Sequence, residues 1–200
     1  LGLSVAMLGD INGDGFSDMA INAPYADSIY DNTGSAYVVF GKAGGYAATL
    51  NVDTLSGSDG FEIIGDGMDA YLGGMNTLSS AGDINGDGLD DIIVSAPSAN
   101  YGSGAAYVVF GSRDGYAASM SLTDLTPDQG FVLEGANVDA DSIGFAASAT
   151  GDINGDGFDD ILIGSYDYYS GGAGVTYVVY GGDFTGDVDT TGSENDDVLI

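Results

Sequence analysis

The sequence predicts an all-β protein made of repeated four-stranded antiparallel units. A nine-residue acidic loop occurs three times, at 10–18, 83–91 and 152–160. A second motif, Tyr-Val-Val-(Phe/Tyr)-Gly, recurs at intervals of 70 residues, beginning at Tyr37, Tyr107 and Tyr177. Short runs rich in Val, Ile and Tyr lie between these motifs and are bounded by Gly, Asp and Ser, which indicates short strands. A repeat of this length and strand number is typical of a β-propeller blade, and is too long for a leucine-rich or ankyrin repeat.

Each unit is expected to run through four strands in order. The first strands lead into the acidic loops, at Ser4 to Leu8, Thr77 to Ala81 and Phe145 to Ala149. The second strands leave the loops, at Met19 to Ala23, Asp91 to Ala96 and Ile161 to Gly164. Because these second strands are nearly all apolar, we expect them to be buried on both faces.

The third strand of each unit carries the Tyr-Val-Val motif, and a longer connection follows it. These connections run over 43–59 and 113–129, and the first is expected to hold a helical turn near Val52 to Leu55. The fourth strands are expected at Gly60 to Ile64 and Gly130 to Glu134. Since the chain begins at a first strand and ends after a third, it holds about two and three-quarter blades. It is therefore a partial propeller or an assembling fragment.

The acidic loops carry oxygen-bearing side chains at positions 1, 3, 5 and 9 and glycine at position 6. This spacing suits Ca²⁺, which takes six to eight oxygen ligands, so we predict three calcium sites. The carbonyl of position 7 is expected to be a ligand, while its apolar side chain packs inward. The predicted ligands are Asp10, Asn12, Asp14, Phe16 and Asp18; Asp83, Asn85, Asp87, Leu89 and Asp91; and Asp152, Asn154, Asp156, Phe158 and Asp160.

Three alternatives to calcium hairpin loops are consistent with some of these residues. An EF-hand needs an acid at position 12, where this chain has Ile21, Val94 and Ile163, so that interpretation fails. Magnesium is disfavoured because a flexible all-oxygen loop does not impose an octahedron. The remaining alternative is that Asp and Asn only cap their own backbone as Asx turns. Three near-identical copies favour metal over turns alone.

The charge of the chain excludes several classes of partner. Asp and Glu number 31 against 2 Lys and Arg, and the net charge is -29. Such a chain repels nucleic acid and anionic lipid. It contains no run of about 20 apolar residues, so we expect no membrane insertion. Three calcium ions would neutralise part of the charge, which couples metal to folding.

The combined motifs resemble the FG-GAP repeat, the blade of the integrin α-subunit propeller and of many bacterial surface proteins. The resemblance rests on Gly-Asp-Ile-Asn-Gly-Asp-Gly, an apolar strand ending in Ala-Pro, and Tyr-Val-Val-Phe-Gly, and covers 1–181 in units 1–66, 67–136 and 137–181. The third unit departs from the pattern at Ser165-Tyr166. The resemblance implies a seven-bladed propeller in the family, with calcium loops bridging the first two strands of a blade. It also supports a role in adhesion.

The C-terminal segment, 182–200, is acidic, and its end at 191–200 resembles the opening of an RTX-type calcium array. A plain acidic tail is the alternative. Asp183, Thr185 and Asp187 lack an acid at the ninth position and are interpreted as a turn. Tyr166, Tyr168 and Tyr169 form a cluster that is either a binding patch or a surface cover.

These features predict a calcium-binding extracellular structural or adhesion module, secreted or at the cell surface, with a bacterial source. Its expected partner is a protein or glycan ligand on a cell surface or matrix. The alternative is a subunit that assembles with other copies of itself into a ring or filament, since partial propellers leave open edges. A third reading is the non-catalytic part of a secreted hydrolase. The chain has no His and no Cys, so we predict no catalytic residue and no enzymatic activity.

Overall fold

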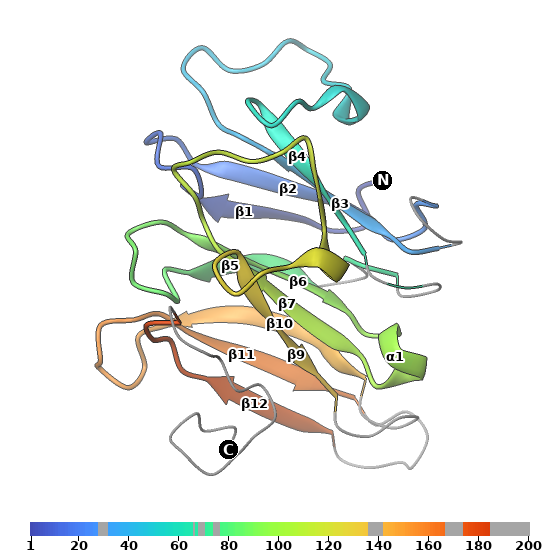
Figure 1. Ribbon diagram of the computed structural model, residues 1–200, viewed down its shortest axis with the longest axis vertical. Helices are drawn as coiled ribbons and strands as arrows, with labels where there is room; N and C mark the ends of the chain where they lie inside the picture. The colour runs from blue at the N-terminus through green and yellow to red at the C-terminus, as the bar shows by residue number, and fades with distance from the viewer. Residues whose placement is uncertain are drawn as a thin grey trace.

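Three antiparallel blades stand one after another along the longest axis of the molecule (Figure 1). A computed structural model describes residues 1–27, 32–65, 67, 71–73, 77–135, 142–166 and 174–184. The first blade contains β1 (Val5–Gly9), β2 (Asp18–Ala23), β3 (Ser35–Val39) and β4 (Gly60–Ile64). The second contains β5 (Leu78–Gly82), β6 (Asp91–Ala96), β7 (Ala105–Val109) and β9 (Gly130–Glu134). The third contains β10 (Ile143–Gly151), β11 (Asp160–Ser165) and β12 (Val175–Val179).

All three blades use the same strand register, which confirms the repeat. Neighbouring strands within each blade pair antiparallel in chain order. The motif tyrosine of the third strand pairs with the equivalent apolar residue of the second strand each time. These pairs are Tyr37 with Ile21, Tyr107 with Val94 and Tyr177 with Ile163. The first strands β1, β5 and β10 lie side by side, so the blades share one inner edge.

The core lies between the blades rather than within them, because each sheet is a single layer with two faces. Successive residues of a strand point to opposite faces. Ile92 and Val94 of β6 therefore pack in a cluster with the first blade, whereas Ile93 packs in a cluster with the third. The second blade is thus covered on both faces, and every residue of β6 is buried.

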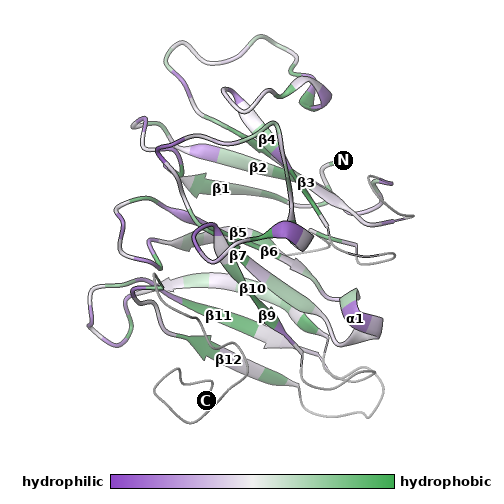
Figure 2. Cartoon of the chain, in the orientation of Figure 1, coloured by the Kyte–Doolittle hydropathy of each residue, from purple (hydrophilic) through white to green (hydrophobic). Residues whose placement is uncertain are grey.

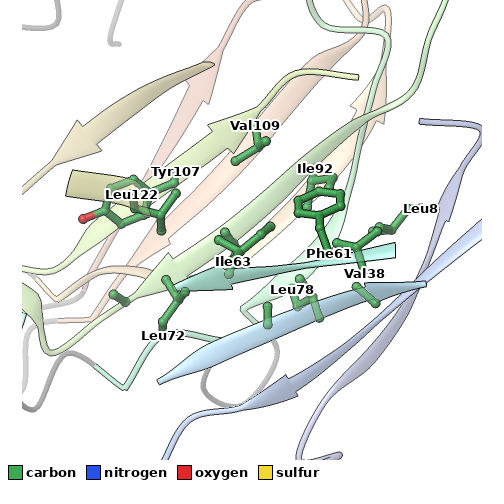
Figure 3. Packing of buried hydrophobic residues seen from close by; sticks show 14 of the residues in the cluster. Leu8, Val38, Phe61, Ile63, Leu72, Leu78, Ile92, Tyr107, Val109 and Leu122 are labelled. Carbon is green, nitrogen blue, oxygen red and sulfur yellow. The ribbon is translucent and has the colours of Figure 1, made fainter. Parts of the chain in front are cut away.

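The cluster between the first two blades joins side chains from both (Figure 3). Leu8, Phe61 and Ile63 of the first blade meet Leu78, Ile92 and Tyr107 of the second. Removing such side chains from water contributes roughly 1.5–3 kcal/mol each. The second cluster, between the second and third blades, is led by Ile84, Ile93, Phe131, Ile161 and Ile163. Figure 2 shows this pattern as apolar strands between polar connections.

The second strands of the two outer blades, β2 and β11, correct one expectation. We expected every second strand to be buried on both faces, but β2 alternates between buried and partly exposed residues, and β11 is only partly covered. The physical reason is position: the first and third blades each have a neighbour on one side only within this chain.

Three short elements, the last of them a second 3-10 turn, were not expected from the sequence. The connection after β7 includes β8 (Ser119–Ser121), which pairs parallel with β4 of the first blade. A four-residue turn, α1 (Ala99–Gly102), follows β6, and its Asn100 and Tyr101 have positive φ and so leave the right-handed helical conformation. The expected helical turn near Val52 is confirmed as a 3-10 helix over Val52–Thr54, and an equivalent turn occupies Leu122–Asp124. None of the described helices is long and apolar enough to span a membrane.

Candidate metal centres

The three acidic loops lie at one end of the blades, each joining a first strand to a second strand. They follow one another along the left edge of Figure 1. Hydrogen bonds show that neighbouring loops are adjacent. Asp90 of the second loop contacts Asp10 of the first, and Asp159 of the third contacts Asp83 of the second. The three copies of the sequence motif therefore form a row of loops along one edge of the molecule.

The three loops are bent by closely similar sets of hydrogen bonds. In the first, the Asp10 carboxylate accepts the N–H groups of Asp14 at 3.0 Å and Gly15 at 2.8 Å. The Asn12 Oδ1 also accepts the Asp14 N–H at 3.0 Å, and Asp14 accepts the Phe16 N–H at 2.9 Å. The other loops repeat most of these bonds. Positions 1, 3 and 5 are thus turned toward the inside of the bend.

The ninth position fastens the loop to its blade. Asp91 Oδ2 accepts the Ile84 N–H at 3.0 Å, and Oδ1 accepts the Gly111 N–H at 2.8 Å. Asp18 and Asp160 hold the equivalent groups in their own blades. All three carboxyls are buried. Burial raises the pKa of Asp18 to about 6 and that of Asp91 to about 7, although the backbone donors partly oppose the shift.

One buried loop oxygen is left without a donor. Asp83 Oδ1 is buried and has no hydrogen-bond partner, although Oδ2 of the same carboxylate accepts the Gly88 N–H at 3.0 Å. A buried acceptor without a partner is costly, and its presence needs an explanation such as a bound ion. In the first and third loops the equivalent oxygen accepts the N–H of the fifth position, so the turn satisfies it there. In the second loop no such bond forms, and a cation bound at the first loop position would satisfy the oxygen.

The predicted ligand set stays a prediction. Across the described ranges, no group of three or more His, Cys, Asp or Glu side chains is arranged to hold a metal ion. The donors fit calcium chemically, because carboxylate, amide and carbonyl oxygens are its ligands. A carboxylate oxygen that already accepts one N–H still has a second lone pair for a cation.

The seventh position corrects a second expectation. We expected its apolar side chain to pack inward in every loop, and Leu89 does so. Phe158 is only partly buried, and Phe16 is 42% exposed. The difference arises because Leu89 and Phe158 lie against the loop of the preceding blade, at Gly13 and Gly86 respectively. Phe16 has no such blade beside it in this chain.

The prediction missed three charged residues at this edge. Asp90 and Asp159, at the eighth loop position, contact the preceding loop rather than their own. Arg113 donates to the carbonyls of Asp87 at 3.3 Å and Gly88 at 3.2 Å. The sequence shows an aspartate at position 8 of two loops, but only the packing of the blades against each other shows which residue that aspartate contacts. The tail 185–200, Tyr168 and Tyr169 lie outside the described residues, so the turn, patch and RTX interpretations stay untested.

Antiparallel blades that share an inner edge, two with four consecutive antiparallel strands and the third with three among the described residues, each with an acidic hairpin loop, define a partial β-propeller. The FG-GAP repeat model matches the chain at 1–39, 75–109 and 144–180. The chain therefore belongs to the FG-GAP repeat family, as the motifs indicated.

Relatives of this chain are integrin α subunits from several animals. The chain is 34% identical to human integrin alpha-7 over 82% of its own length and 12% of that protein. It is 35% identical to Drosophila melanogaster integrin alpha-PS5 over 78% of its length, and 31% identical to Xenopus laevis integrin alpha-4 over 78%. It spans 14% of each of those two relatives. The expected bacterial source stays a prediction.

Proposed function

We propose that this chain is a calcium-stabilised adhesion module of an extracellular protein, with one Ca²⁺ in each acidic loop. The observation that carries the proposal is the buried, unpartnered Oδ1 of Asp83 at the first position of a loop rich in oxygen ligands. Three repeats of the same loop support it. Bound calcium would supply positive charge where carboxylates gather.

Under this proposal the residues of each loop would have separate tasks. Asp10, Asp83 and Asp152 would hold calcium while their carboxylates also accept the N–H groups that bend the loop. The ninth-position acids would join the ion to the start of the second strand, because they also hold backbone groups of the blade. Calcium would therefore stabilise the hairpin, and the partner surface would lie elsewhere.

Adhesion is proposed from the family. The relatives are integrin α subunits, and the chain covers only a small part of each. The proposed partner is a protein or glycan on a cell surface or matrix, and the proposed location is secreted or cell-surface. No residue of the chain is assigned to ligand contact or to catalysis.

Thermal unfolding followed by circular dichroism tests the calcium role. Calcium at 100 times its Kd adds about 2.7 kcal/mol of stability per site. For a chain of this size that raises the Tm by roughly 5–10 °C per site. Magnesium at the same concentration is expected to raise the Tm far less. Equal melting temperatures in calcium and chelator would contradict the proposal.

A charge-matched pair of variants makes the test specific to the loops. Asp83→Asn removes one predicted ligand charge, and Asp124→Asn removes the same charge from an exposed turn. We expect Asp83→Asn to lose roughly the calcium-dependent Tm gain of one site. We expect Asp124→Asn to keep the full gain. An equal loss in both variants would mean that calcium acts only by general screening.

Self-association is a second candidate, because both ends of the row of blades expose apolar side chains. Val5 and Met7 of β1 are 68% and 63% exposed, and Phe145 of β10 is 52% exposed. Two unlike surfaces of this kind support head-to-tail contacts that form rings or filaments. Sedimentation velocity with calcium and with chelator tests it. Defined oligomers only in calcium would support assembly, and a monomer in both would exclude it for this chain.

A further inference from the structure

We infer that the aspartate at the eighth loop position is a clamp that holds the calcium loop of the preceding blade. Asp90 and Asp159 are the two clamp residues. Each would position the first calcium ligand of a neighbouring loop, so that calcium binding in one blade depends on the next. The calcium part of this inference rests on the proposed function.

Both clamps make the same pair of hydrogen bonds across the blade boundary. Asp90 Oδ2 accepts the backbone N–H of Asp10 at 2.8 Å, and the Asp90 N–H donates to the Asp10 carbonyl at 3.3 Å. Asp159 does the same on Asp83, at 3.0 Å and 3.1 Å. Hence both backbone groups of the first loop residue are held by the following blade. A carboxylate acceptor makes the stronger kind of hydrogen bond.

The glycine before each clamped residue leaves room for the carboxylate. Gly9 and Gly82 have φ of +82° and +70°. A Cβ at either glycine would lie 2.1 Å from a carboxylate oxygen of Asp90 or Asp159. The Gly-Asp dipeptide that opens the loop is therefore shaped to receive an acid from the neighbouring blade, as well as to start a turn.

Other contacts close the same boundary around the clamp. The N–H that follows the Tyr-Val-Val-(Phe/Tyr)-Gly motif donates to the carbonyl of the second residue in the preceding loop, from Ser112 to Ile11 at 2.8 Å and from Gly182 to Ile84 at 2.9 Å. Ile11 and Ile84 are 0% exposed. The clamp thus lies at the rim of a buried contact, where loss of the acceptor leaves an N–H without a partner and costs free energy.

The third loop lacks a clamp among the described residues and serves as an internal comparison. The nearest atom to a Cβ built on Gly151 is 4.0 Å away, and Ile153 is 54% exposed, unlike Ile11 and Ile84. Among the described residues the third loop therefore has the fewest contacts with another blade. We expect it to bind calcium about tenfold more weakly than the other two, the effect of losing one such bond.

Hydrogen–deuterium exchange of the full chain, resolved by loop, tests the clamp. Asp90→Ala is expected to speed exchange in 10–18 by about tenfold and to change 152–160 little. Asp159→Ala is expected to speed exchange in 83–91 and to leave 10–18 unchanged. Asn at either position retains an acceptor oxygen, so Asp90→Asn should restore most of the protection. If Asp90→Ala does not fold, the Asn variant and Asp159→Ala still test the pattern.

Ser17→Ala is the matched control, because Ser17 occupies the eighth position of the first loop and has no preceding loop in this chain. It should alter none of the three loops. Faster exchange confined to the loop that carries the substitution would overturn the inference.

Repeating the exchange in chelator and in calcium separates the two proposals. If the cross-blade pattern appears in chelator and calcium has no effect on any loop, the clamp stands and the calcium function fails. If calcium protects the loops but Asp90→Ala leaves 10–18 unchanged, the calcium function stands and the clamp fails.

Discussion

At the residue scale, the ninth loop position shows how burial and charge act together. Asp18 and Asp91 each accept two backbone N–H groups and are removed from water. Burial raises the pKa of Asp18 to about 6 and that of Asp91 to about 7, from the ordinary value of 3.8. Without metal the folded state therefore holds protons that the unfolded chain releases.

This shift predicts the pH dependence of the metal-free protein. The stabilisation from protonated Asp18 and Asp91 is complete below the unfolded pKa of 3.8 and is lost as pH rises through about 6 and 7. In chelator we expect the Tm to fall between pH 4 and about 7.5. Asp91→Asn, which cannot ionise, should show a shallower fall, and Asp124→Asn should follow the wild type. A Tm that rises over this range in chelator would contradict the assignment.

At the element scale, β4 and the connection after β7 join the first two blades. Phe61 of β4 stacks on Tyr116 of that connection with ring centroids 4.1 Å apart. The Tyr116 hydroxyl donates to the carbonyls of Ile11 and Phe110 at 3.3 Å and 3.2 Å. The connection therefore links β4 to an acidic loop through one side chain.

Truncation of Phe61 is expected to weaken this junction. Phe61 is fully buried, so Phe61→Ala should lower the free energy of unfolding by about 3–5 kcal/mol. Leu50→Ala, at a residue 39% exposed, should change it by less than about 0.5 kcal/mol. Urea unfolding measures both. Similar losses in the two variants would mean that Phe61 does not hold the blades together.

The strands were largely predictable because their signals are local. The predicted fourth strands match β4 and β9 residue for residue, and the first two strands of each blade are placed within two residues. The parallel pairing of β8 with β4 was not predictable, because Ser-Met-Ser has no strand pattern and its partner lies in another blade. Strands β2 and β11 are less buried than their sequences suggest because burial of both faces needs a blade on each side, and their blades have only one neighbour in this chain.

The loops were predictable in position and only partly in contacts. The spacing of Asp and Asn predicted the bend of the loop, because hydrogen bonds within the loop form that bend. Asp90 and Asp159 were missed because their partners come from the preceding blade, some 80 and 76 residues away. A repeat in the sequence does not show which neighbouring blade a side chain faces.

At the scale of the whole molecule, a net charge of -29 opposes compact packing. Two interblade cores must outweigh this repulsion. In chelator, we expect the Tm to rise as NaCl increases from about 10 mM to 500 mM, because the Debye length falls from about 30 Å to below 10 Å. The rise should be smaller in calcium, since three bound ions would remove part of the charge. A Tm independent of salt in chelator would show that repulsion is not significant.

The most direct measurement is a calcium titration of the chain by isothermal calorimetry, begun from the metal-free protein. We expect three calcium ions per chain, two bound more tightly and the third more weakly, since the third loop has no clamp among the described residues. Asp83→Asn should weaken or remove one of the tighter sites. Absence of calcium binding at millimolar concentration, or no change in Asp83→Asn, would contradict the account that these loops hold calcium.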